Sequence, residues 1–136
     1  MDPFTITCAR RGATLEFFDR EPDDVSRPID YFSVRVRDIN LTASARVYHY
    51  GPTLVCLFDE IAAEWRGWDE SKMWESLEGE LKLRCGNDRR GHITIQAQFR
   101  SGHYDHDWFV QSAVIVEAGQ LDDIARRARK FFGAGA

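Results

Sequence analysis

The residue types best suited to chemistry are concentrated in the segment HYDHD, at residues 103–107. Two histidines and two aspartates in five residues are groups that metal ions bind. We expect this segment to form a hairpin tip between strands, without the fixed ligand spacing of a metal site. His49 between two tyrosines and His92 after a glycine are interpreted as structural histidines with satisfied hydrogen bonds. The sequence therefore predicts no metal site and no histidine base.

Nucleophilic catalysis has no recognisable motif in the chain. There is no G-x-S-x-G elbow, and the glycines are isolated rather than gathered into a phosphate-binding loop. The three cysteines, Cys8, Cys56 and Cys85, are far apart and have apolar neighbours, so we expect them to be reduced core residues without a disulfide. One catalytic alternative is left: two carboxylates on neighbouring strands, for example at Glu78 or Glu80, could form an acid–base pair. We predict a protein that is not an enzyme and has no cofactor.

Tryptophan is the other unusual feature, because three of the four tryptophans lie in the stretch EWRGWDESKMWESL, Glu64–Leu77. Trp65 continues an apolar stripe of helical period, so we expect it to be buried. Trp74 has the parity of Glu78 and Glu80 and is predicted to point outward. Trp68 lies in a connection, where it either closes the hydrophobic layer or helps to form a partner-binding surface.

The spacing of apolar residues predicts which segments form strands and which form helices. Apolar residues alternate over 4–8, 15–17, 32–36, 41–47, 77–85 and 93–99, and a more continuous apolar run covers 108–117. Apolar residues at helical spacing cover 54–65 and 121–132. The order ββββαβββα predicts a single α+β domain over residues 1–136. We expect two layers, with a predominantly antiparallel sheet of about seven strands and two helices packed on one face.

The sheet face turned away from the helices is a candidate surface for recognition. Alternation places polar and charged side chains on it, among them Arg35, Arg46, Glu78, Glu80 and Arg84. One interpretation is a solvated sheet face. The other is a surface for a protein partner, with tryptophan as an anchor at its edge. The predicted partner-binding residues are Trp68, Trp74, Arg35, Arg46, Glu78, Glu80 and Arg84.

Composition narrows the classes of partner. The chain has 136 residues, 43% of them hydrophobic, and a formal net charge of −4. Nucleic-acid-binding domains are usually basic, so we expect no nucleic acid. The N-terminus lacks the pattern of a signal peptide, and no apolar run approaches the roughly 20 residues that span a bilayer. These features predict a cytoplasmic protein that does not bind membranes.

One set of motifs has a family resemblance. The run WRGWDESKMWESLEGEL, then RRGHITIQAQFR, then EAGQLDDIARRARKFF resembles an uncharacterised bacterial family of small domains of unknown function. The shared pattern is W-R-G-W, W-x-S-L-E-G-x-L, and G-H before an alternating strand, over roughly residues 30–132. The family has no established activity. The resemblance therefore implies a bacterial stand-alone domain and transfers no catalytic residue.

The leading functional hypothesis is a small cytoplasmic bacterial protein-interaction module of the immunity or toxin-neutralising type. This role needs a stable scaffold and one complementary surface. The alternative is a small-ligand-binding domain that uses a groove between the helices and the sheet. We expect a protein partner, and a chain that is a monomer or a weak homodimer.

Overall fold

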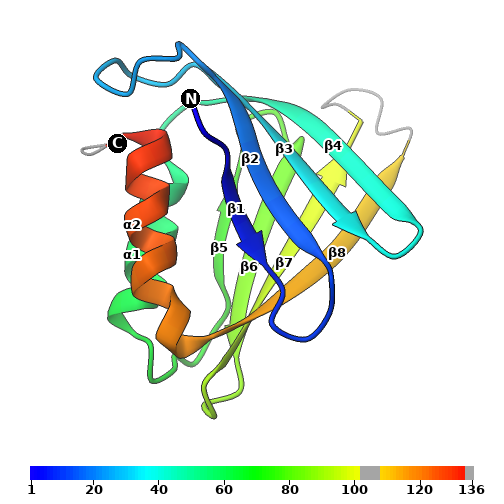
Figure 1. The fold of residues 1–136 in the computed structure, drawn as a ribbon, viewed down its shortest axis with the longest axis vertical. Helices are drawn as coiled ribbons and strands as arrows, with labels where there is room; N and C mark the ends of the chain where they lie inside the picture. Colours follow the sequence, from blue (N-terminus) through cyan, green and yellow to red (C-terminus); the bar gives the residue numbers. More distant parts are fainter. Residues whose placement is uncertain (102–107, 134–136) are drawn as a thin grey trace.

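The part of the chain that the structure describes forms eight strands and two α-helices (Figure 1). The computed structural model describes residues 1–101 and 108–133. The elements are β1 (Phe4–Thr7), β2 (Thr14–Glu21), β3 (Tyr31–Asp38), β4 (Leu41–Tyr48), α1 (Leu54–Ala63), β5 (Lys72–Glu75), β6 (Leu81–Asn87), β7 (His92–Arg100), β8 (Phe109–Glu117), the short 3₁₀ helix η1 (Ala118–Gln120) and α2 (Leu121–Phe132). The α+β class expected from the sequence is confirmed.

The strands form two sheets. Sheet A has the order β1-β2-β3-β4, sheet B has the order β5-β6-β7-β8, and all neighbours are antiparallel. The expectation of one sheet of about seven strands is therefore wrong. Alternation reports which face of a strand is buried but not which strand it pairs with, and each half of the chain pairs within itself.

The additional strand comes from a turn that the alternation concealed. The sequence predicted a continuous strand through residues 77–85, but a tight turn separates β5 from β6, with Ser76 N donating to Leu81 O at 2.9 Å and Gly79 N to Ser76 O at 3.1 Å. Gly79 has a φ of +80°, a left-handed conformation that glycine adopts without a steric penalty. Leu77, expected in the core, is 61% exposed in this turn.

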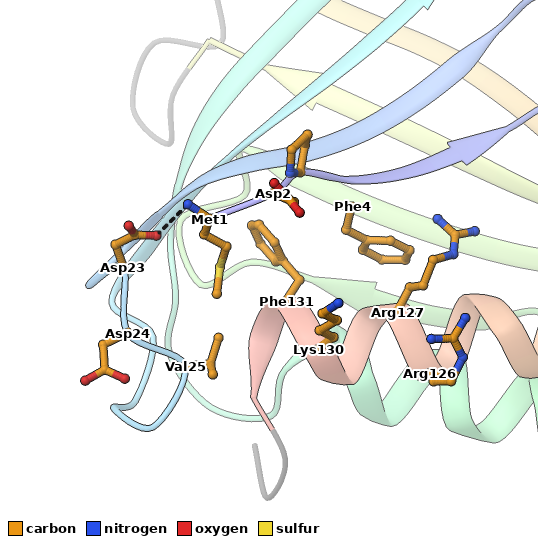
Figure 2. Close-up of a pocket in the computed structure, with 11 residues that line it drawn as sticks. Met1, Asp2, Phe4, Asp23, Asp24, Val25, Arg126, Arg127, Lys130 and Phe131 are labelled. Atoms are coloured by element: carbon orange, nitrogen blue, oxygen red, sulfur yellow. Dashed lines mark ion pairs between the residues drawn. The ribbon is translucent and has the colours of Figure 1, made fainter.

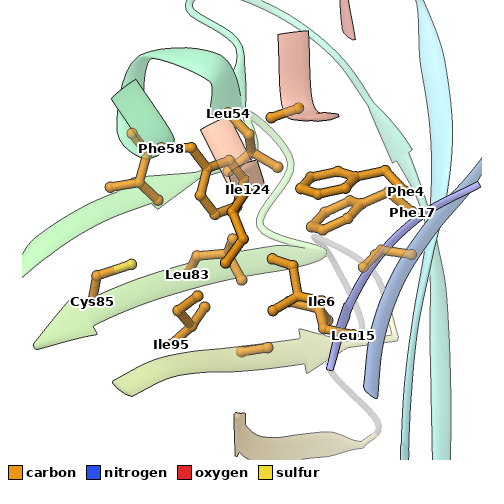
Figure 3. Close-up of a cluster of buried hydrophobic side chains, with 14 of the residues drawn as sticks. Phe4, Ile6, Leu15, Phe17, Leu54, Phe58, Leu83, Cys85, Ile95 and Ile124 are labelled. Atoms are coloured by element: carbon orange, nitrogen blue, oxygen red, sulfur yellow. The ribbon is translucent and has the colours of Figure 1, made fainter. Parts of the chain in front are cut away.

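Both sheets and both helices share one hydrophobic core (Figure 3). Phe17 of β2 lies at its aromatic centre, with its ring 5.3 Å from Phe4, 6.0 Å from Phe32, 6.5 Å from Phe58 and 5.7 Å from Phe132. These partners come from β1, β3, α1 and α2. Figure 1 shows the two helices side by side along one side of the two sheets. The core therefore joins the halves of the chain into one unit.

The loop after β1 bridges the two sheets at β8. Ala9 N donates to Ile115 O at 2.7 Å, and Ile115 N donates to Cys8 Sγ at 3.4 Å. The Arg11 guanidinium donates to Ala113 O and also pairs with Asp38 at 2.7 Å. These bonds satisfy edge-facing backbone groups of Ala113 and Ile115, so the loop covers this part of the edge of sheet B.

Helix α1 is shorter than its apolar stripe. Thr53 caps its N-terminus, because its Oγ1 accepts from Val55 N at 3.1 Å. The helix ends at Ala63, two residues before Trp65, and Trp65 is 50% exposed. The expectation of a buried Trp65 is wrong, because the helical period that would point it inward no longer applies beyond the helix end.

Helix α2 agrees with the sequence pattern. Its predicted stripe is buried, and the chain turns at Gly133 after the last helical residue. Acidic residues lie in its first turn and basic residues in its last, as the helix dipole favours. Among the described residues, neither helix is long and apolar enough to cross a bilayer.

Candidate functional site

The structure places Trp68 in the core. It is 7% exposed, and its indole N–H donates to Cys85 O at 3.3 Å. The Asn87 amide donates to the Trp68 carbonyl at 2.9 Å, which fixes the connection between α1 and β5. Of the two interpretations of Trp68, the structure supports closure of the hydrophobic layer. Its ring is not available as a surface anchor.

Trp74 faces inward rather than outward. It pairs with Leu83, a buried residue of β6, and its ring centroid is 6.4 Å from that of Phe32. Its indole N–H donates to Pro52 O at 2.9 Å. The predicted outward orientation is wrong because the turn between β5 and β6 interrupts the alternation on which it rested.

Glu80 is also buried, at 8% exposed, although alternation had placed it in water. One carboxylate oxygen accepts from Ser76 Oγ at 2.5 Å and the other from Tyr48 N at 3.3 Å. Glu80 therefore joins the turn before β6 to the end of β4. Glu78 is half-buried in the same turn and does not lie on a sheet face.

The predicted arginines lie on two different sheets. Arg35 and Arg46 are on the outer face of sheet A, and Arg84 is exposed on the outer face of sheet B. The predicted set of partner-binding residues does not therefore form one continuous sheet face. Of these arginines, the two on sheet A, Arg35 and Arg46, contact aromatic side chains.

Arginine and aromatic side chains adjoin one another on the outer face of sheet A. We call Phe18, Tyr31, Arg35, Arg46 and Tyr48 the arginine–aromatic face. The Arg35 guanidinium lies 4.3 Å from the centroid of the Phe18 ring and pairs with Glu16, which is directly opposite it on β2. The guanidinium is thus held between a ring and a carboxylate.

Arg46 is held in the same way at the other end of this face. Its guanidinium donates to Asp19 O at 2.6 Å and Ser33 Oγ at 3.0 Å, and lies 5.7 Å from the Tyr31 ring centroid. The Tyr31 ring is in turn 5.4 Å from that of Tyr48. The sequence pattern predicted the two arginines of this face but not its aromatic residues. Two features of the sequence could have indicated them. Phe18 follows the inward-facing Phe17 and so has the outward parity, and Tyr31 and Tyr48 lie at the ends of their strands.

The two described histidines, His49 and His92, do not form an assembled site. His92 Nδ1 is 2.7 Å from Asp88 Oδ2 in the turn before β7, and this bond lowers the pKa of Asp88 to about 2. Burial lowers the pKa of His49, whose Nε2 is buried without a hydrogen bond to any described residue, so the expectation of a satisfied histidine is wrong for that nitrogen. The predicted 103–107 segment lies outside the described residues. Within residues 1–101 and 108–133, no group of three or more His, Cys, Asp or Glu is arranged to hold a metal.

The three cysteines are reduced, but only two belong to the core. Cys8 and Cys85 are 6% and 0% exposed, whereas Cys56 is exposed on the outer side of α1. The prediction of a buried Cys56 is wrong because α1 directs its neighbours on either side inward. Burial raises the pKa of the Cys85 thiol to about 12.

This difference predicts selective thiol labelling. At pH 8, a maleimide or disulfide reagent should modify Cys56 in the folded protein and leave Cys85 unmodified, because reaction needs an accessible thiolate. Mass spectrometry after brief labelling, with and without denaturant, measures this. All three thiols should react in denaturant. Labelling of Cys85 as fast as Cys56 in the native state would contradict the assigned burial.

A groove lies between α2 and the loop that joins β2 to β3 (Figure 2). Residues 1–4, residues 23–25 and the last two turns of α2 line it, and its volume is about 700 Å³. Phe4 and Phe131 form an apolar floor, with Val25 at one side. The volume lies within the range of about 300–1,000 Å³ typical of small-molecule sites. The groove expected from the sequence lay between the helices and the sheet, whereas this one lies between the end of α2, residues 1–4 and the loop that joins β2 to β3.

Arg20 holds the two walls of this groove together from the interior. It is 4% exposed, and its guanidinium donates to carbonyls of both walls. On the helix side the acceptors are Phe131 O at 2.8 Å and Phe132 O at 3.2 Å; on the loop side they are Pro22 O, Asp24 O and Arg27 O at 2.5, 3.1 and 2.8 Å. Five backbone acceptors thus surround one buried cation, and the groove is preformed.

Comparison with known proteins identifies the family. Searches of the curated proteins and of the solved structures gave no significant match. The model of a family of unknown function, DUF6228, matches residues 6–135. This match covers both helices, strands β2–β8 and the second half of β1, and it confirms the expected membership of a family of unknown function. The chain belongs to the family of unknown function DUF6228.

Proposed function

We propose that this chain is a protein-interaction module that binds its partner through the arginine–aromatic face of sheet A. The observation that carries the proposal is the stacking of Arg35 on Phe18 and of Arg46 near Tyr31 on a four-stranded antiparallel sheet. We further propose a bacterial cytoplasmic setting and a role of the immunity or toxin-neutralising type.

The composition of the face supports this proposal. Tyrosine and arginine are enriched among the residues that contribute most to protein–protein binding energy. Here their side chains are held before any partner arrives, Arg46 by Asp19 O and Ser33, and Arg35 by Glu16. Binding would therefore require little further ordering of long side chains, a cost that otherwise reduces affinity.

Charge neutralisation on the face indicates how a partner is recognised. Arg35 is paired with Glu16, and Arg46 lies 3.8 Å from Glu21. Since each cation has a local anion, we expect recognition to rest on planar packing against the arginines and rings. The affinity should accordingly depend only weakly on salt, because long-range attraction between net charges is the component that salt screens.

A comparison of two arginines tests the proposal. A partner is first isolated by affinity capture from an extract of the source organism, and its dissociation constant is then measured by calorimetry. Arg46→Ala should weaken binding by about 2 kcal/mol or more, roughly 30-fold. The matched control is Arg84→Ala on the outer face of sheet B, which should change the dissociation constant less than about twofold. An equal loss in both variants, or none in Arg46→Ala, would reject this face as the binding surface.

The groove beside α2 supports a second candidate function, the binding of a small ligand. It has the volume of a ligand site, an apolar floor and charged side chains at its rims. This candidate differs from the first in the face it uses, because the groove is lined by residues 1–4, residues 23–25 and α2 rather than by the outer face of sheet A. The two can therefore be tested independently.

A further inference from the structure

The helix side of the groove carries an unpartnered cation. Arg126 and Arg127 both pair with Asp123, and Arg127 also donates to Thr5 O at 2.5 Å. Lys130, one turn further along α2, has no hydrogen bond or ion pair to any residue that the structure describes. A flexible ammonium with three donors is thus available at the rim of the groove.

The opposite side of the groove is acidic, and its carboxylates have local partners. Asp23 lies 3.3 Å from the amino group of Met1, and Asp24 Oδ1 accepts from Ser26 N at 3.0 Å and Ser26 Oγ at 2.7 Å. The hydrogen bonds from Ser26 lower the pKa of Asp24, so it stays ionised at neutral pH. This rim should repel a second negative charge on a ligand.

The floor between the two rims is apolar and partly open to water. Phe4 and Phe131 lie at its base and are only 2% and 3% exposed, so the apolar surface open to water comes mainly from Val25 and Met1, which are 43% and 51% exposed. Figure 2 shows Phe131 between Val25 on one side and Phe4 on the other, so the apolar surface is elongated. Covering it with a hydrocarbon chain would remove apolar area from water.

The walls are held in place, so the groove does not have to form on binding. Arg20 joins the loop to the end of α2, as described above. Gly133, with a φ of +99°, allows the chain to pass close to the loop, since a Cβ there would lie 3.1 Å from Val25 O. Preorganisation of this kind lowers the free-energy cost of binding.

We propose that the groove binds a single-chain monocarboxylate amphiphile, a fatty-acid-like molecule. Its carboxylate would pair with Lys130, and its hydrocarbon chain would lie against Val25 and Met1, above the buried rings of Phe4 and Phe131. The acidic rim formed by Asp23 and Asp24 selects against dicarboxylates. This inference rests on the second candidate function, small-ligand binding, and specifies its ligand class.

A titration with matched probes tests the ligand class. Dodecanoate, dodecanol, dodecanedioate and dodecyltrimethylammonium are added separately, below their micelle concentrations, to the ¹⁵N-labelled chain. Dodecanoate should shift the amide resonances of Asp2, Phe4, residues 23–27 and residues 126–132. It should bind about fivefold more tightly than dodecanol or dodecanedioate, the size of the effect expected for a partly exposed ion pair.

Variants assign the carboxylate and the chain to their contacts. Lys130→Met should remove the preference of dodecanoate over dodecanol, whereas Lys82→Met on sheet B should leave it unchanged. Val25→Asp should weaken dodecanoate binding at least tenfold, because it places a charge on the apolar floor beside an acidic rim. Val25 is 43% exposed, so this variant is expected to fold.

The outcomes separate the ligand class from the site. Equal or tighter binding of dodecanol, dodecanedioate or the ammonium probe, with shifts at the groove, would overturn the monocarboxylate class and leave small-ligand binding in place. The absence of groove shifts with all four probes would overturn both. A preference for dodecanoate that persists in Lys130→Met would overturn the assigned contact and with it the proposal.

Discussion

Replacing Arg20 with methionine is expected to lower the free energy of unfolding by about 3–5 kcal/mol, the range found when one partner of a buried charged network is removed. Methionine keeps most of the side-chain volume but provides no donors. The five carbonyls that accept from Arg20 would lose their partner, and each one that water does not reach adds to the cost.

Urea denaturation followed by circular dichroism measures this effect. Arg84→Met is the control, because Arg84 is exposed on sheet B and its replacement should change stability by less than about 0.5 kcal/mol. Arg20→Lys should also be strongly destabilised, because a single ammonium lacks the five donors of a planar guanidinium. A loss below about 1 kcal/mol in Arg20→Met would show that the carbonyls find water and that Arg20 does not hold the walls.

The position of Arg20 shows why the sequence did not reveal this role. The segment beginning at Arg20 is rich in proline and acidic residues, a composition typical of an exposed loop. A β-bulge between Phe18 and Glu21, with Asp19 at a φ of +50°, changes the parity of the strand and turns Arg20 inward. Such an irregularity is determined by pairing with β3 and is not visible in the pattern of one strand.

Much of the remaining fold could be predicted because burial leaves a direct record in the sequence. The alternation over residues 32–36 matches the inward Phe32, Val34 and Val36 of β3, and the helical stripe over 121–132 matches the buried face of α2. The division into two sheets could not be predicted in the same way. Both arrangements bury the same side chains, and strand partners depend on contacts distant in the sequence.

The candidate site was predictable to a smaller extent. Arg35 and Arg46 were correctly placed on an outer sheet face, because β3 and β4 are regular strands. Glu80 and Trp74 were assigned to the wrong face. The residues of the turn before β6 continue the alternating pattern of that strand in the sequence, so the turn could not be recognised from the pattern. The groove was not predictable in detail, since it joins residues 1–4 to residues 126–131, and only tertiary contacts bring these segments together.

The tryptophan cluster gives the second large effect, and the structure reverses what the sequence led us to expect. Trp68→Ala should lower the free energy of unfolding by about 3–5 kcal/mol, as for other large aromatic residues removed from a core. Trp68 is 7% exposed, and its N–H bond to Cys85 O would also be lost. Trp65→Ala should cost less than about 1 kcal/mol, because its ring is half exposed and its neighbour is the Arg66 guanidinium, 4.9 Å away.

The two alanine variants serve as controls for each other, because they remove the same side chain three residues apart. Thermal or urea unfolding of both should show a large loss for Trp68→Ala and a small one for Trp65→Ala. Tryptophan fluorescence gives a second readout, since the emission lost in Trp65→Ala should be that of a more solvent-exposed indole. A larger loss in Trp65→Ala would mean that the apolar stripe of α1 continues past Ala63, as its spacing in the sequence suggests. The end of the helix therefore decides which tryptophan anchors the connection to β5.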